Sequence, residues 1–137
     1  MVSLRVAKVF GADSVCGVLM VAAKPFSFLG DVTVDLAEVR GVGRIAGTIL
    51  LAPAAVGSTV GPYVLYALSR RGLAPKALAV KSVDPALVAG CVLAGVSLYR
   101  LLDEGADFNA LKALSGANAC IEGGVLNAHW WVSWGTS

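Results

Sequence analysis

Charge is scarce in this 137-residue chain: 15% of the residues are Asp, Glu, Lys or Arg, whereas 57% are hydrophobic. A typical water-soluble domain carries about 25% charged residues, so we expect a protein whose apolar surface is covered by lipid. The formal net charge is only +2, and the basic residues are scattered along the chain. Because nucleic-acid binding needs a concentrated basic surface, we exclude nucleic acid as a partner.

Metal-ligating residues are also few. The three cysteines, Cys16, Cys91 and Cys120, are far apart and form no C-x-x-C spacing, and His129 is the only histidine. One histidine cannot supply both ligands of a bis-histidine haem, and a zinc site needs more ligands than these. We therefore expect no metal and no cofactor, and we interpret the cysteines as free thiols that pack among apolar neighbours.

Motifs of independent enzymes are absent as well. The chain has neither a G-x-S-x-G nor an H-E-x-x-H sequence. The glycines of Gly41–Gly47 do not have the spacing of a phosphate-binding loop, and small-residue helix packing explains them better. We therefore expect a protein that is not an enzyme.

What the sequence does contain is a long uncharged run. Ile45 to Leu68 comprises 24 residues without an Asp, Glu, Lys or Arg. About 20 apolar residues suffice for a helix to cross the hydrocarbon core of a bilayer. The run therefore predicts a transmembrane helix, and Pro53 and Pro62 predict that this helix is bent.

The other apolar stretches extend this interpretation to the whole chain. We expect an all-α, polytopic integral membrane protein, a compact bundle of four transmembrane helices, or of three if the first does not cross fully. The helices are expected at residues 6–24, 45–68, 86–102 and 108–132, with an interfacial segment at 25–44, in one domain of residues 1–137. Asp84-Pro85 is typical of a helix N-cap followed by proline in the first turn.

The basic residues predict how such a bundle is oriented. The connection from Ser69 to Pro85 holds four Lys and Arg residues and one Asp. The positive-inside rule then places both termini on the cytoplasmic, matrix or stromal side of the membrane. Trp130, Trp131 and Trp134 are expected as aromatic anchors at that interface.

Small residues recur at spacings that let helices approach closely. In a membrane, helix association depends strongly on such residues, because lipid supplies no hydrophobic driving force between helices. The residues expected at helix contacts are Gly57, Gly61, Gly90, Gly116, Cys120 and Gly124.

Two carboxylates fall inside the expected helices. Glu122 lies deep in the fourth helix and Asp13 lies near the start of the first. A charge near the centre of a bilayer costs about 3 kcal/mol on insertion scales, so such residues are candidates for proton transfer. The alternative is structural: Glu122 hydrogen-bonds Asn118 or Asn127 and locks two helices, and Asp13 reaches the interface beside a basic residue.

These features favour a non-catalytic accessory subunit of a larger membrane complex. Short loops leave little room for a site outside the membrane, and the glycine faces suit docking. We expect an energy-transducing assembly (respiratory chain, ATP synthase or photosystem), with other membrane subunits and lipids as partners. The expected location is the mitochondrial inner membrane, with the thylakoid and the bacterial plasma membrane as alternatives.

A second hypothesis is a small, oligomeric, proton-coupled transporter that uses Glu122, Asp13 or both. Four short helices with an acidic residue in the first, within the sequence GADSVCGVLMVAAK, are similar to the small multidrug-resistance transporters. That resemblance implies that Asp13 binds substrate and protons in turn.

Overall fold

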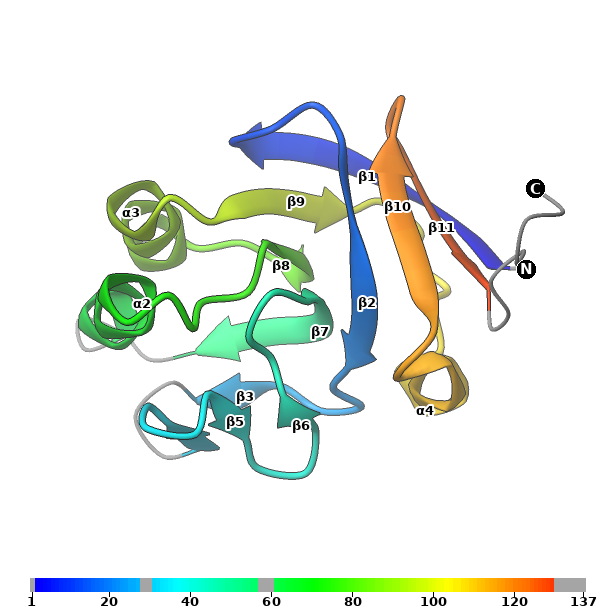
Figure 1. Ribbon diagram of the computed structural model, residues 1–137. Helices are drawn as coiled ribbons and strands as arrows, with labels where there is room; N and C mark the ends of the chain where they lie inside the picture. Colours follow the sequence, from blue (N-terminus) through cyan, green and yellow to red (C-terminus); the bar gives the residue numbers. More distant parts are fainter. Residues whose placement is uncertain (1, 28–30, 57–60, 130–137) are drawn as a thin grey trace, which may run out of the picture.

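The computed structural model describes residues 2–27, 31–56 and 61–129 (Figure 1). Its strands are β1 (Val2–Phe10), β2 (Val15–Val21), β3 (Phe26–Ser27), β4 (Val32–Thr33), β5 (Glu38–Val39), β6 (Gly43–Arg44), β7 (Ile49–Val56), β8 (Ala77–Ser82), β9 (Ser97–Leu101), β10 (Asn118–Glu122) and β11 (Val125–His129). Its helices are α2 (Gly61–Arg70), α3 (Pro85–Ala94) and α4 (Phe108–Leu111), and a 3-10 turn at Lys112–Leu114 follows α4.

Most of the strands form one sheet that closes on itself. The strand order is β2-β10-β11-β1-β9-β8-β7-β3, and β2 also pairs with β7. The first half of β2 runs antiparallel to β10, whereas Leu19–Val21 of the same strand run parallel to Ile49–Leu51 of β7. Strand β2 therefore joins the antiparallel strands to the parallel strands, and Figure 1 shows it passing between the two. On the antiparallel side, Val2 of β1 lies opposite Ala128 of β11.

The parallel part consists of two β-α-β units. Helix α2 connects β7 to β8, α3 connects β8 to β9, and the three strands are parallel neighbours. Asp84 caps α3, because its carboxylate accepts a hydrogen bond from the Leu87 N–H at 2.7 Å. The helix ends at Gly95, which adopts a left-handed conformation with φ of 71°. This turn returns the chain to the sheet as β9.

Neighbouring residues of β7 face two different cores. Ile49 and Leu51 belong to the core inside the closed sheet, whereas Leu50 and Ala52 belong to the core shared with α2 and α3. All four side chains are fully buried. Side chains alternate between the two faces of a strand, and both faces of β7 are covered. Every residue in this part of the strand is therefore apolar.

This burial on both faces explains the uncharged run Ile45–Leu68, and it shows that the transmembrane helix predicted there is wrong. The run contains all of β7 and most of α2, with residues 57–60 between them. The strand and the helix each need apolar residues, and together the two elements form an apolar stretch as long as a membrane span. Among the described residues, no helix is both long enough and apolar enough to cross a bilayer.

The other predicted helices are wrong for a related reason, and the all-α fold class is wrong with them: the fold is mostly β. Residues 6–24 contain part of β1 and all of β2, and residues 25–44 contain β3 to β6. Residues 86–102 contain most of α3 and all of β9, and the described part of 108–132 contains α4, β10 and β11. Short buried strands have the same hydropathy as helices when the turns between them consist of small residues. Gly11, Gly95 and Gly116 lie in such turns, and each has a positive φ.

A second, small sheet contributes Val39 to the core shared with α2 and α3. Strands β4, β5 and β6 form it in that order. The turn between β4 and β5 contains Ala37, which is fully buried and has φ of 51°. The carbonyl oxygen of Ala37 accepts a hydrogen bond from the N–H of Ile45 at 2.8 Å. This bond links the turn of the small sheet to the segment that leads from β6 into β7. An ion pair between Asp35 and Arg71 joins the small sheet to the end of α2.

Candidate functional site

Strands β3 and β7 are parallel and end at the same edge of the sheet. Ser27, the last residue of β3, lies opposite Val56, the last residue of β7. In sheets of parallel strands joined by helices, ligands bind beyond the carboxyl ends of the strands. The two segments that continue from this edge, residues 28–30 and 57–60, lie outside the described residues. Functional side chains are therefore expected among the described residues beside this edge.

A hollow of about 340 Å³ lies next to β3. It is bounded by the connection from β2 to β3, by the turn between β5 and β6, and by the 3-10 turn after α4. Its lining residues are Ala22, Ala23, Lys24, Pro25, Phe26, Asp31, Arg40, Gly41, Val42 and Lys112. We call this space the cationic hollow, because three of its lining residues are basic and one is acidic.

Asp31 organises one wall of the cationic hollow. Its carboxylate accepts a hydrogen bond from the Ser27 N–H at 2.8 Å, and the Arg40 guanidinium lies 3.9 Å from the same carboxylate. The Arg40 N–H donates to the Asp31 carbonyl oxygen at 2.7 Å. These contacts link the end of β3 to the small sheet and hold Arg40 at the hollow.

The other two cations come from distant parts of the chain. Lys112 donates a hydrogen bond from its ammonium group to the carbonyl oxygen of Gly41. Lys24 is exposed, and among the described residues it has no hydrogen-bond or ion-pair partner. The lining therefore has an excess of two positive charges over Asp31, and Lys24 is free to bind an anion. Lys and Arg side chains in such an arrangement bind phosphate and carboxylate groups.

The two predicted proton-transfer residues lie elsewhere. Asp13 is exposed in the connection between β1 and β2, where it forms an ion pair with Lys8. The hydrogen bond from Lys8 and its positive charge lower the pKa of Asp13. Glu122 is exposed at the end of β10, opposite Val125. Neither carboxylate lies in a helix, and neither lines the cationic hollow.

The residues predicted at helix contacts are distributed over several kinds of structure. Gly61 is the first residue of α2, and Gly90 in α3 faces α2, so that a Cβ added there would lie 3.0 Å from Pro62 Cα. Gly116 and Gly124 have positive φ and lie in turns on either side of β10, so they do not share a helix with Cys120. Gly57, Trp130, Trp131 and Trp134 lie outside the described residues.

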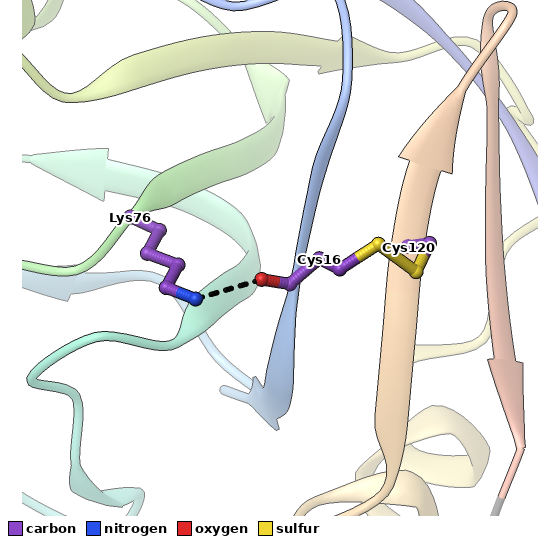
Figure 2. The surroundings of a disulfide bond; sticks show 3 residues. All are labelled: Cys16, Lys76 and Cys120. Atoms are coloured by element: carbon purple, nitrogen blue, oxygen red, sulfur yellow. Dashed lines mark hydrogen bonds between the residues drawn. A yellow bond between two sulfur atoms is a disulfide. The ribbon is translucent and has the colours of Figure 1, made fainter.

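The expectation of three free thiols is wrong for two of them. Cys16 and Cys120 form a disulfide between β2 and β10, shown in Figure 2. Their pairing could not be read from the sequence, because it depends on which strands become neighbours. Cys91 is free and fully buried in the core shared with α2 and α3, where burial raises the pKa of its thiol to about 12.

Metal-ligating side chains do not gather in the described part of the chain. No three His, Cys, Asp or Glu residues there are close enough to hold a metal ion together.

The sequence does not indicate the residues of the cationic hollow as a site. Lys24 falls at the end of the helix expected at residues 6–24, Arg40 falls in the expected interfacial segment at 25–44, and Lys112 falls near the start of the helix expected at 108–132. Their separation in the sequence gives no motif, and only the closed sheet brings them together. The one local signal is that Lys24-Pro25 directly precedes a short strand, as expected for residues at the edge of a sheet.

Comparison with known proteins places this chain in a family. Residues 4–124 match the family model described as the aconitase X swivel domain. Because the match covers most of the chain, the chain belongs to the aconitase X swivel domain family.

Individual relatives narrow the comparison. The phosphomevalonate dehydratase small subunit of Pyrococcus abyssi is 40% identical over 100 residues, which cover 68% of this chain and 76% of that protein. The phosphomevalonate dehydratase small subunit of Pyrococcus furiosus is 38% identical over 114 residues, covering 78% and 80%. The crystal structure of Thermococcus kodakaraensis aconitase X in its holo-form is 28% identical with a TM-score of 0.76, and the match covers 94% of this chain and 99% of that one.

These findings correct the functional predictions. The relatives are subunits of a dehydratase, so the predictions of an accessory subunit in an energy-transducing complex and of a proton-coupled transporter are both wrong. The prediction of a protein that is not an enzyme is wrong for the same reason, because these relatives form part of one. The predictions of membrane subunits and lipids as partners and of a mitochondrial, thylakoid or plasma-membrane location are wrong as well, because the relatives are dehydratase small subunits and no helix among the described residues is long and apolar enough to cross a membrane.

Proposed function

We propose that this chain is the small subunit of a dehydratase that removes water from phosphomevalonate or a closely similar phosphorylated hydroxy acid. The observation that carries the proposal is the similarity to phosphomevalonate dehydratase small subunits at 40% identity, within a family match that extends from residue 4 to residue 124. A small subunit implies a larger partner chain, and the active enzyme is then a complex of the two.

Dehydration of such an acid removes a proton from one carbon and hydroxide from its neighbour. The electron pair of the broken C–H bond forms the new C=C bond, and the proton and hydroxide leave together as water. The substrate must be held so that both bonds are aligned, and correct orientation contributes much of the rate enhancement in enzymes. We assign part of this orientation to the cationic hollow and the acid–base chemistry to the larger subunit.

The charges of the substrate fit the cationic hollow. A phosphate monoester carries about −1.5 to −2 at neutral pH, and a carboxylate adds a further negative charge. The lining of the hollow has two more positive than negative charges, and its volume of about 340 Å³ is at the lower end of the range for small-molecule sites. One anionic group of the substrate therefore fits here, while the rest of the molecule extends toward the edge where β3 and β7 end.

Reconstitution tests the proposed reaction. The chain is produced together with the larger protein that co-purifies with it, and loss of phosphomevalonate is followed by proton NMR, which also detects the new alkene hydrogen. We expect turnover by the complex and none by either protein alone. Absence of turnover by an intact, correctly assembled complex would contradict the proposal, and so would equal turnover by the larger protein alone.

Lys24 tests the role of the cationic hollow. Since a hydrogen bond to a charged group contributes about 1.5–3 kcal/mol, Lys24→Met is expected to raise KM by about 10- to 100-fold with the complex still assembled. The matched control is Lys81→Met, at the end of β8 and outside the hollow, which we expect to leave KM unchanged. If both substitutions change KM equally, Lys24 does not bind the substrate.

A further inference from the structure

The disulfide between Cys16 and Cys120 lies at the joint between the two halves of the closed sheet. The two residues are direct partners in the antiparallel register of β2 and β10, with their Cα atoms 4.0 Å apart. Only three residues further along β2, at Leu19, pairing changes to the parallel strand β7. The disulfide therefore fixes β2 to the antiparallel half just before the strand passes to the parallel half.

Cys16 is also held from the opposite side. Lys76, which directly precedes β8, donates a hydrogen bond from its ammonium group to the Cys16 carbonyl oxygen at 2.9 Å. Figure 2 shows the lysine and the disulfide on opposite sides of β2. The side chain of Cys16 thus connects β2 to β10, while its backbone connects β2 to the parallel half.

The disulfide is accessible to reagents in solution. Cys16 is exposed and Cys120 is half-buried. Disulfide exchange begins when a thiolate attacks one of the two sulfur atoms, and exposed disulfides are the ones that react readily. The remaining cysteine, Cys91, is buried, and its thiol pKa of about 12 keeps it protonated and unreactive at neutral pH.

We propose that Cys16–Cys120 is a redox-sensitive site that a dithiol opens in the folded protein, releasing the first half of β2 from β10. A thiolate of the dithiol attacks Cys16 Sγ, the bond between the two sulfur atoms breaks, and Cys120 leaves as a thiolate that takes up a proton. The second thiol of the reagent then displaces Cys16, which is also protonated. Two electrons pass to the protein, and the reagent leaves as a cyclic disulfide.

The contacts around β2 limit the opening. Beyond Cys16, the N–H of Leu19 donates to the Ala117 carbonyl oxygen at 2.8 Å, and the Val21 N–H donates to Ser115 Oγ at 2.9 Å. Pairing with β7 also begins at Leu19. We therefore expect Val15–Val18 to separate from β10 after reduction, while Leu19–Val21 stay in place.

The experiment uses the full chain under native conditions, and it does not depend on the proposed function. The protein is treated with dithiothreitol, thiols are counted with a colorimetric reagent, and backbone hydrogen exchange is measured by NMR before and after. We expect two new thiols per chain, faster exchange of amides at 15–18 and 118–121 that face the β2–β10 boundary, and unchanged exchange at 19–21. The enclosed loop spans 104 residues, so we also expect Tm to fall by about 10 °C. Treatment with oxidised glutathione restores all three values.

Variants distinguish reduction of the Cys16–Cys120 disulfide from general effects of the reductant on the protein. Cys91→Ser should give the same two thiols and the same change in exchange, whereas the double variant C16S/C120S should show the faster exchange at the outset and no response to dithiothreitol. If the double variant does not fold, the reversible reduction of the unmodified chain still tests the proposal. The proposal is overturned if no thiols appear until the protein is denatured, if the two thiols are already free after treatment with oxidised glutathione, or if exchange is unchanged once two thiols have formed.

Discussion

Gly11 is a residue where the backbone conformation and the space available permit only glycine. Its φ is 103°, and a Cβ added there would lie 2.7 Å from Ser97 Cα. The adjoining Ala12 is fixed by two contacts, because its N–H donates to Ser97 Oγ at 3.0 Å and its carbonyl oxygen accepts a hydrogen bond from Tyr99. The turn after β1 therefore rests directly on β9, with no room for a side chain.

Gly11→Ala is expected to reduce the free energy of unfolding by about 3 kcal/mol, from backbone strain together with the displacement of β9. Urea unfolding followed by circular dichroism measures the change. Gly105→Ala is the matched control, since Gly105 is exposed and a Cβ there would meet no atom within 4 Å. Equal stability of the two variants would show that the turn can move away from β9.

The ion pair of Asp13 and Lys8 makes a prediction about pH. The hydrogen bond and charge of Lys8 lower the pKa of Asp13 below its usual value of 3.8. The folded state therefore takes up this proton less readily than the unfolded state, so the contact stabilises the fold above pH 3.8 and is lost as the pH falls through the lower folded value. An NMR titration should place the Asp13 midpoint below 3.8, and Lys8→Met should raise it, whereas Lys81→Met should not. A midpoint unaffected by Lys8→Met would rule out the ion pair in solution.

At the scale of elements, the packing of α2 on α3 depends on one small residue. A Cβ on Gly90 would lie 3.0 Å from Pro62 Cα and 3.2 Å from Leu65 Cδ1. Both atoms belong to α2, and one of them is backbone, so the helices must separate to accept a larger residue. The apolar core beneath them, which includes Leu65, Leu87 and Cys91, would lose contacts.

Gly90→Val is therefore expected to lower the free energy of unfolding by about 2 kcal/mol, as is usual for overpacking. Ala89→Val places the same β-branched residue on the exposed face of the same helix, so it reports the cost of helix propensity alone, about 0.5 kcal/mol. Thermal unfolding of both variants checks the difference. If the two lose the same stability, the contact between α2 and α3 tolerates expansion.

Some elements could be predicted from the sequence, and others could not. Asp84-Pro85 correctly indicated where α3 begins, because an N-cap depends only on nearby residues. The helix predicted at residues 86–102 extends beyond the end of α3 at Ala94, because the residues of β9 that follow are also largely apolar. Pro53 was interpreted as a helix bend, but it lies in β7 between the residues paired with β2 and those paired with β3.

At the scale of the whole molecule, composition was misleading because the protein has a core on each side of its parallel strands. Two covered faces require many apolar residues and few charged ones, which is also the composition of a membrane protein. Long-range pairing, such as that of Leu19 with Ile49, decides between the two, and a single sequence does not contain it. The cationic hollow depends on the same pairing, so it could not be predicted either.

Leu19 tests whether the closed sheet unfolds as one unit. Its side chain is fully buried in the core inside the sheet, at the point where β2 changes partner. Leu19→Ala should lower the free energy of unfolding by about 2–5 kcal/mol and leave a single transition that circular dichroism and fluorescence report together. Leu93→Ala, at a position 62% exposed on α3, should change stability by less than about 0.5 kcal/mol. Two separate transitions in the Leu19 variant would show that the halves of the sheet fold independently.

The pairing of β1 with β11 has a consequence for how this fold is built into larger chains. Val2 and Ala128 lie side by side, so the first and last described strands begin and end at one place on the surface. A polypeptide attached before β1 and one attached after β11 would leave the closed sheet from the same point. Gene fusion could therefore join this unit to another protein in either order and present the same faces to it.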